Sequence, residues 1–181
     1  MDKGSMDYRR FLDGDEDGLA QIITDYKDGL ILYLNTLVGD LVLAEDLAED
    51  TFVRLFTRRP RDKGTGSFKT WLYTIGRNLA ISHLRKAGNQ TTVPIDTVAF
   101  LSNGDEPLTA YLQEESRLAL HRAMETLKPE HRQILWLIYF DGLSYKEAAK
   151  LMKKSVHSTE MLANRARQAL KTQLNGLEVT L

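Results

Sequence analysis

The chain has 181 residues, of which 43% are hydrophobic, so it is long enough for one ordinary domain or two small helical ones around packed cores. It contains no cysteine, which excludes disulfides and thiolate metal sites and favours a reducing cytoplasm. No apolar run approaches the roughly 20 residues of a membrane-spanning helix, and no apolar signal core begins the chain, so neither membrane insertion nor export is expected. Residues 1–5 end in Gly-Ser, which is typical of an expression-tag remnant, so Met6 is expected to be the natural start and the residues before it to lie outside the fold.

The net charge of −1 conceals blocks of opposite sign along the chain. Residues 1–59 carry a net charge of −6 and residues 60–90 carry +5, followed by −4 over residues 91–120 and +4 over residues 121–181. Two basic blocks separated by an acidic one suggest two contact surfaces for a polyanion. Chance clustering of charge on solvated helices explains the same pattern about equally well.

Hydrophobic periodicity predicts helices in the first part of the chain and no convincing strand. A helical pattern runs from Asp15 to Val38, and Gly29 together with the Gly39-Asp40 pair suggests that it is divided into two helices. A third helix is predicted roughly over residues 43–58, because Pro60 ends it.

The third predicted helix is unusually acidic. Acidic residues near a helix N-terminus compensate the macrodipole, but this segment holds more of them than that role needs. Phe52 and Arg54 lie on or near the same surface, so the helix is expected to face a basic protein partner. The four acidic residues are Glu45, Asp46, Glu49 and Asp50.

Ser67 is a good N-cap for a fourth helix, predicted from Phe68 to about Lys86. Its apolar stripe includes Trp71, which is expected to be a core residue. Basic groups interleaved with aromatic ones suit single-stranded nucleic acid, because the charges follow the backbone while the rings offer stacking surfaces. An ordinary amphipathic helix is the alternative, although the amide of Asn78 is suited to bond a base edge exposed by strand opening. The residues outside the stripe are Lys69, Tyr73, Arg77, Asn78, His83, Arg85 and Lys86.

Residues 88–113 have no sustained period and contain prolines, glycine and scattered acidic residues, which predicts a linker. Helical periodicity resumes over residues 114–127, and a further helix is predicted to begin at Pro129 and to reach about Phe140. The fold class is therefore expected to be all-α, with two small helical domains joined by a flexible linker.

The C-terminal segment predicts a helix-turn-helix. Ser144 and Glu147 form a capping box for a short helix, and a turn at Lys153-Lys154 leads to a longer helix that Ser155 caps. The second helix of such a motif enters the major groove of DNA with its N-terminal end first. A plain helical hairpin with a solvated basic face is the alternative. The outer face carries His157, Ser158, Glu160, Met161, Asn164 and Arg165, and the groups best suited to phosphates are Lys153, Lys154, Arg165, Arg167 and Lys171.

Catalytic chemistry is not expected. The four histidines show no paired metal-ligand spacing, and the chain has neither a phosphate-binding glycine loop nor a nucleophile motif. The sequence therefore predicts no enzyme activity, no catalytic residue, no cofactor, no metal and no small-molecule substrate.

These segments, in this order, resemble the extracytoplasmic-function (ECF) group of bacterial RNA polymerase sigma factors. The resemblance covers nearly the whole chain, from Asp7 to Leu174. It is carried by residues 44–55, 71–78, 127–132, 141–149 and 165–167.

The resemblance implies a protein that binds core RNA polymerase and directs promoter-specific transcription initiation in the cytoplasm, with an anti-sigma factor as a further partner. Residues 7–87 would form sigma domain two, residues 114–176 sigma domain four, and residues 88–113 the linker along the RNA exit path. Domain two would bind the polymerase clamp helices and recognise and open the minus-ten element. Domain four would contact the polymerase flap and bind the minus-thirty-five element through its helix-turn-helix.

The site residues implied by the resemblance and by the residue patterns fall into three groups. The polymerase-binding group is Glu45, Asp46, Glu49, Phe52 and Arg54. The minus-ten group is Lys63, Tyr73, Arg77, Asn78, His83, Arg85 and Lys86, in which Asn78 stands where the family contacts a non-template base. The minus-thirty-five group is Lys153, Lys154, His157, Ser158, Glu160, Met161, Asn164, Arg165 and Arg167.

The chain departs from the family pattern at several positions. Glu49-Asp50 replaces the usual Gln-Glu, Ser82 stands where an Asp is common, and Lys153 stands where the turn usually has Gly. If Lys153 is left-handed, strain of about 1 kcal/mol follows. The recognition helix also lacks the usual basic pair near its start. A helix-turn-helix regulator that never binds polymerase and an adaptor that never binds DNA are the alternative functions.

Overall fold

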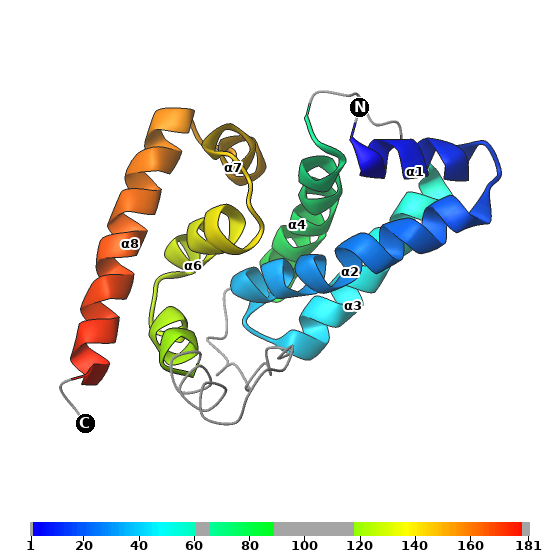
Figure 1. The fold of residues 1–181 in the computed structure, drawn as a ribbon. Helices are drawn as coiled ribbons and strands as arrows, with labels where there is room; N and C mark the ends of the chain where they lie inside the picture. The colour runs from blue at the N-terminus through cyan, green and yellow to red at the C-terminus, as the bar shows by residue number, and fades with distance from the viewer. Residues whose placement is uncertain (1, 61–65, 89–117, 179–181) are drawn as a thin grey trace, which may run out of the picture.

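The computed structural model describes residues 2–60, 66–88 and 118–178. Within these ranges the chain consists of helices and turns without a strand, so the expected all-α class is confirmed (Figure 1). The expected linker over residues 88–113 lies, apart from its first residue, outside the described residues. The helices are α1 (Lys3–Leu12), α2 (Glu16–Val38), α3 (Leu41–Arg58), α4 (Phe68–Lys86), an unlabelled helix over residues 118–125, α6 (Pro129–Leu135), the π-helical turn η1 (Trp136–Phe140), α7 (Tyr145–Met152) and α8 (Val156–Glu178).

Short polar side chains begin the helices of the first domain, as their sequence predicts. The Asp40 carboxylate accepts the Leu43 N–H at 3.1 Å, and the Ser67 hydroxyl accepts the Thr70 N–H at 3.3 Å. Gly39 closes α2 in the left-handed region with φ of 71°, which a residue without Cβ adopts at no steric cost. Local capping therefore accounts for where α2 ends and where α3 and α4 begin.

The prediction that α2 is divided at Gly29 is wrong. The helix runs unbroken from Glu16 to Val38, with Gly29 in its interior. A Cβ on this residue would lie 2.5 Å from the Tyr73 hydroxyl, so its small size serves a close approach to α4. A glycine inside a helix costs only about 1 kcal/mol, which tertiary packing readily outweighs.

The expectation that residues 1–5 lie outside the fold is wrong for the described residues 2–5. Helix α1 begins at Lys3, and the Asp2 side chain caps it by accepting the Ser5 N–H at 2.8 Å. Gly4 is buried against α2 and α4. The sequence near the N-terminus gave no sign of this packing, because the residues that contact Asp2 and Gly4 come from segments far along the chain.

Helices α1 to α4 surround one hydrophobic core, in which α2 contacts α1, α3 and α4. Four leucines from three helices are fully buried there, and the half-buried Trp71 packs at its edge against Tyr8 and Phe68. Burying a leucine contributes about 1.5–3 kcal/mol, so this layer is a main source of the stability of the domain. The four leucines are Leu30, Leu34, Leu55 and Leu72.

The second domain packs α6, η1, α7 and α8 together. The helix expected from Pro129 to Phe140 is present, but its last turn is π-helical, and the Trp136 and Phe140 rings stack with centroids 4.7 Å apart. Its core includes the fully buried Ile134, Leu137 and Leu151.

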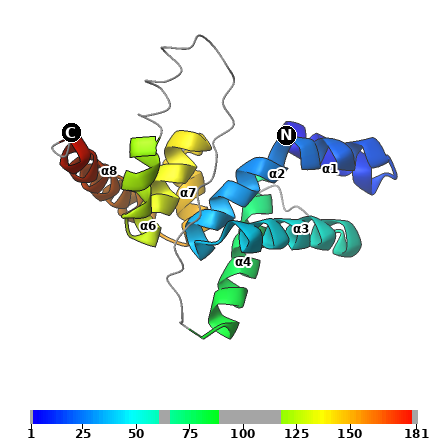
Figure 2. The same ribbon diagram turned by 90° about the horizontal axis from the view of Figure 1, so that it is seen from below.

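The two domains lie side by side and share a continuous apolar cluster (Figures 1 and 2). Helix α2 contacts α6 and η1, and α4 contacts α7. The first turn of the helix-turn-helix therefore rests on the helix that was expected to read single-stranded DNA.

Candidate polymerase and nucleic-acid interfaces

Helix α3 presents an acidic face to solvent. Glu45, Asp46 and Glu49 are all exposed, as expected for a protein-binding surface. Two exposed valines flank them, Val42 with 68% and Val53 with 53% of its surface accessible. Residues 42, 46, 49 and 53 follow the helical spacing of one face, so exposed apolar side chains lie at both ends of the acidic row and offer a protein partner apolar area beside the charges.

The two remaining members of the polymerase-binding group lie differently. Phe52 is only 5% exposed and stacks on Phe56 at 6.3 Å, because its position on α3 faces the core. Arg54 is half-buried. In this structure Phe52 supports the acidic face from behind and offers almost no surface to a partner.

Helix α4 exposes Asn78, His83, Arg85 and Lys86 on its C-terminal half. Arg77 is half-buried, with its guanidinium beside the Tyr33 hydroxyl. Lys63, also expected to contact the minus-ten element, lies outside the described residues. The described basic groups and the Asn78 amide thus form one accessible surface near the end of α4.

Tyr73 lies inside the molecule. It has 0% of its surface exposed, stacks on Tyr33 at 5.2 Å and donates a hydrogen bond to Asp141 Oδ1 at 3.3 Å. Burial and the adjacent Asp141 carboxylate both raise the pKa of the Tyr73 hydroxyl. The Tyr73 ring therefore has no free face for a base in this arrangement, because it is buried against Tyr33 of α2 and its hydroxyl is bonded to Asp141 of the second domain.

Asp141 is the centre of a polar contact between the domains. Its Oδ1 lies 2.7 Å from Lys69 Nζ, which also donates to the Asp141 backbone carbonyl at 3.0 Å. The Asp141 side chain is only 7% exposed, and burial raises its pKa although Lys69 acts in the opposite direction. A second link joins the Ser67 hydroxyl to Glu147 Oε1 at 2.8 Å, so the N-cap of α4 contacts the capping box of α7.

The helix-turn-helix has the geometry that its sequence predicts. The Ser144 hydroxyl accepts the Glu147 N–H at 3.3 Å, and Glu147 Oε2 accepts the Ser144 N–H at 3.0 Å. Lys153 ends α7 in the left-handed region with φ of 56°, where the strain expected of a residue with Cβ applies. Thr159 and Leu162 are buried on the inner face of α8.

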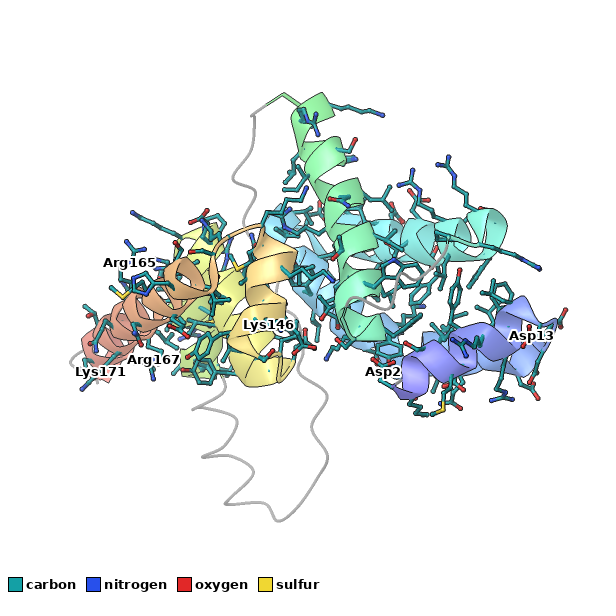
Figure 3. The ribbon with its side chains drawn as sticks, turned by 90° about the horizontal axis from the view of Figure 1, so that it is seen from above. Asp2, Asp13, Lys146, Arg165, Arg167 and Lys171 are labelled. Carbon is teal, nitrogen blue, oxygen red and sulfur yellow. The ribbon has the colours of Figure 1, made fainter. Side chains whose placement is uncertain are left out.

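The outer face of α8 is accessible over its first half. All nine side chains of the expected minus-thirty-five group are exposed. Figure 3 shows Arg165 and Arg167 on α8, at the end of the molecule farthest from α1. Two members have local partners, since Lys154 pairs with Glu130 at 3.3 Å and the Arg167 guanidinium bonds the Asn164 side chain.

Comparison with known proteins matches both domains in order. The family model described as Sigma-70 region 2 matches residues 22–90, and the one described as Sigma-70, region 4 matches residues 117–170. The ECF RNA polymerase sigma factor SigM of Bacillus subtilis is 30% identical over 157 residues, which cover 87% of this chain and 95% of SigM. The chain belongs to the ECF group of RNA polymerase sigma factors.

Further relatives support the assignment of this chain to the sigma factors. SigW of Bacillus subtilis is 27% identical over 175 residues, covering 91% of this chain and 92% of SigW. The sigma factor RpoE of Bartonella quintana, solved in complex with the anti-sigma factor NepR, superimposes with a TM-score of 0.68 at 25% identity over 88% of this chain and 98% of RpoE. As a sigma factor, the protein binds core RNA polymerase and directs promoter-specific transcription initiation.

Sequence reasoning missed two features of this sigma factor, the exposed valines on α3 and the ion pair between Lys69 and Asp141. The valines on α3 were detectable from helical spacing alone. Lys69 and Asp141 gave no such signal, because the ion pair joins residues 72 positions apart in the sequence. In the described ranges, no group of three His, Asp or Glu residues is placed to hold a metal, and none of the helices there is long and apolar enough to cross a membrane.

Proposed function

We propose that this sigma factor divides its contacts among three surfaces, and that the acidic face of α3 is the one that binds core RNA polymerase. The observation that carries this assignment is an exposed row of carboxylates, Glu45, Asp46 and Glu49, between the exposed Val42 and Val53. The carboxylates attract a basic partner and speed its encounter, while the valines bury apolar area on docking. Phe52 and Arg54 belong to this site as supporting residues.

The second surface is the C-terminal half of α4, which we assign to the minus-ten element. Exposed Asn78 suits a base edge, and His83, Arg85 and Lys86 suit the strand backbone. Arg77 and Lys63 complete the basic part of this surface. Tyr73 stays outside this accessible surface in the present arrangement, because its ring is buried against Tyr33 of α2 and its hydroxyl is bonded to Asp141.

The third surface is the exposed face of α8, which we assign to the minus-thirty-five element. Its first turns carry Ser158, Asn164 and Arg165 for base edges. Lys153, Lys154 and Arg167 are placed for phosphates. His157, Glu160 and Met161 complete the face and distinguish it from a uniformly basic helix.

The remaining assignments follow from the family. We assign residues 7–87 to sigma domain two, with Asp2–Met6 added to it, residues 114–176 to sigma domain four and residues 88–113 to the linker. Members of the family are generally not enzymes, and none of the three surfaces needs a cofactor, a metal or a small-molecule substrate. RpoE was solved with an anti-sigma factor, which supports a partner of that class here. A cytoplasmic location agrees with the absence of cysteine.

Transcription with purified core RNA polymerase tests the assignment of α3. The chain carrying Asp46→Lys and Glu49→Lys is compared with one carrying Asp13→Lys and Asp28→Lys, which changes the net charge equally at exposed positions away from α3. We expect the first pair to lose polymerase capture and run-off transcripts from genomic fragments, and the second pair to retain both. Retained capture by the first pair would contradict the assignment, and no capture by the unaltered chain would leave only a helix-turn-helix DNA-binding protein.

Single alanine substitutions test the two DNA-binding assignments independently. Asn78→Ala should weaken promoter opening about tenfold while polymerase binding is unchanged, because one base contact is lost. Arg165→Ala should weaken the upstream footprint, whereas Gln168→Ala, also exposed on α8, should not. Equal loss of polymerase binding and promoter opening in Asn78→Ala, or an unchanged footprint in Arg165→Ala, would assign these residues to structure instead.

A further inference from the structure

Helix α1 lies before the matched Sigma-70 region 2, which begins at residue 22, and none of the expected site residues is on it. It packs along α2 and reaches the start of α4, as the position of Asp2 in Figure 3 shows. Its contacts fall on the two residues on either side of the segment 61–67, namely Pro60 after α3 and Phe68 at the start of α4.

Asp2 connects the first turns of two helices. Its Oδ1 accepts the Ser5 N–H at 2.8 Å, which caps α1, and its Oδ2 accepts the Phe68 N–H at 2.7 Å, which lies at the start of α4. Burial opposes ionisation of Asp2, but these backbone hydrogen bonds hold its pKa below the ordinary value. A single carboxylate therefore ties the beginning of α4 to the beginning of α1, and a side chain with one acceptor is unable to serve both.

Tyr8 makes the corresponding contact at the other border. Its hydroxyl donates to the Pro60 carbonyl at 2.7 Å, and its ring is 2% exposed. The same ring contacts Phe68 with centroids 5.7 Å apart and Trp71 at 5.2 Å. One side chain thus contacts the end of the α3 segment and the first turn of α4 together.

The close fit of α1 depends on Gly4. A Cβ at this position would lie 2.5 Å from the Phe68 ring and 2.5 Å from the Tyr26 hydroxyl. Atoms this close repel strongly, so any larger residue would push α1 away from Phe68. The absence of a side chain at Gly4 lets Asp2 reach its two N–H donors while Tyr8 reaches the Pro60 carbonyl.

We propose that α1 is a positioning element for minus-ten recognition, with Asp2 and Tyr8 as its positioning residues. By holding Pro60 and Phe68 in fixed relation, α1 sets the place and direction of the start of α4. A DNA-reading surface needs its residues held to within a fraction of an ångström by hydrogen bonds and packing behind them. This inference rests on the proposed role of α4 in reading the minus-ten element.

The test uses variants that remove one contact and keep the rest. Asp2→Ser retains a hydroxyl able to cap α1 but has no second acceptor for Phe68. Tyr8→Phe retains the ring and removes only the hydroxyl. Lys3→Gln is the matched control, because Lys3 pairs with Asp25 on α2 and touches neither border of the segment.

Each variant is combined with core RNA polymerase and a linear promoter fragment mapped by run-off transcription with the unaltered chain. Promoter opening is measured by permanganate reactivity of unpaired thymines, and polymerase affinity by competition. Amide hydrogen exchange of the free chain by NMR reports on Phe68. We expect each test variant to lower opening about fivefold, as the loss of one hydrogen bond implies, and the double variant about twenty- to thirtyfold. Polymerase affinity should stay within about twofold, and the Phe68 amide should exchange faster in Asp2→Ser only.

The outcomes separate this inference from the proposed function. Opening at the unaltered level in both test variants overturns the positioning role. An equal fall in polymerase affinity and opening also overturns it, because the helix would then serve only the stability of the domain. If the unaltered chain binds polymerase but opens no promoter, the proposed function of α4 fails, and the inference fails with it.

Discussion

Replacement of Asp141 by alanine should separate the two domains. The substitution removes the acceptor of Lys69 Nζ at 2.7 Å and of the Tyr73 hydroxyl at 3.3 Å. It leaves the backbone carbonyl of residue 141, which Lys69 also contacts, in place. The change therefore tests the side-chain contacts at the domain interface without altering the turn that carries them.

The magnitude follows from what remains after the substitution. Lys69 keeps 28% of its side chain exposed and still reaches water, so its lost ion pair costs about 1 kcal/mol. The buried Tyr73 hydroxyl loses its hydrogen-bond acceptor, which costs about 1 kcal/mol more. Together these losses amount to about 2 kcal/mol, which raises the ratio of separated to packed domains about thirtyfold.

Fluorescence energy transfer between the domains measures this ratio. The chain has no cysteine, so Asp13→Cys and Lys171→Cys provide two unique labelling sites at exposed positions, one on each domain. Single-molecule transfer histograms should show a low-transfer population that grows about thirtyfold relative to the high-transfer one in Asp141→Ala. Glu130→Gln is the control, because Glu130 pairs with Lys154 inside the second domain, and it should leave the histogram unchanged.

A double-mutant cycle measures the coupling between the Tyr73 hydroxyl and the Asp141 side chain. Tyr73→Phe removes the hydroxyl that Asp141→Ala strands, so the two changes combined should cost about 1 kcal/mol less than their sum. Strictly additive effects would refute the coupling between Tyr73 and Asp141 on which the magnitude depends. An unchanged histogram in Asp141→Ala would show that the apolar cluster alone holds the domains together.

Three further outcomes follow from the structure. Lys153→Gly should stabilise the chain by about 0.5–1 kcal/mol in urea unfolding, because Lys153 is left-handed at φ of 56°, and a loss of stability would contradict the strain. Gly18→Ala should destabilise it by about 1–3 kcal/mol in the same assay, since a Cβ there would lie 2.4 Å from the Asp7 carbonyl and 2.9 Å from the Phe11 nitrogen; an unchanged midpoint would refute the clash. Because burial raises the pKa of Asp141, the packed state binds a proton more readily than the separated one, so energy transfer should be highest below the ordinary pKa of an aspartate and should fall as the pH rises through the raised pKa. This pH dependence should vanish in Asp141→Asn.

The sequence alone determined the features that depend on neighbouring residues. Helical periodicity predicted the helical segments from Asp15 onward but not α1, and the predicted caps Ser67 and Ser144 make the expected hydrogen bonds. The accessible faces of α3 and α8 followed from the same period, because polar positions opposite an apolar stripe face solvent. These features were predictable since each depends on residues within a few turns of one another.

The tertiary structure alone decided which residues meet across the chain. Tyr73 carries a polar hydroxyl on an aromatic ring, and only the positions of Tyr33 and Asp141 show that it is buried and not offered to DNA. Gly29 was expected to break a helix and instead allows a close approach. Asp2 was expected to lie outside the fold and instead caps α1 and holds the start of α4. Pairings of this kind depend on the packing of whole helices, which local propensity and spacing do not encode.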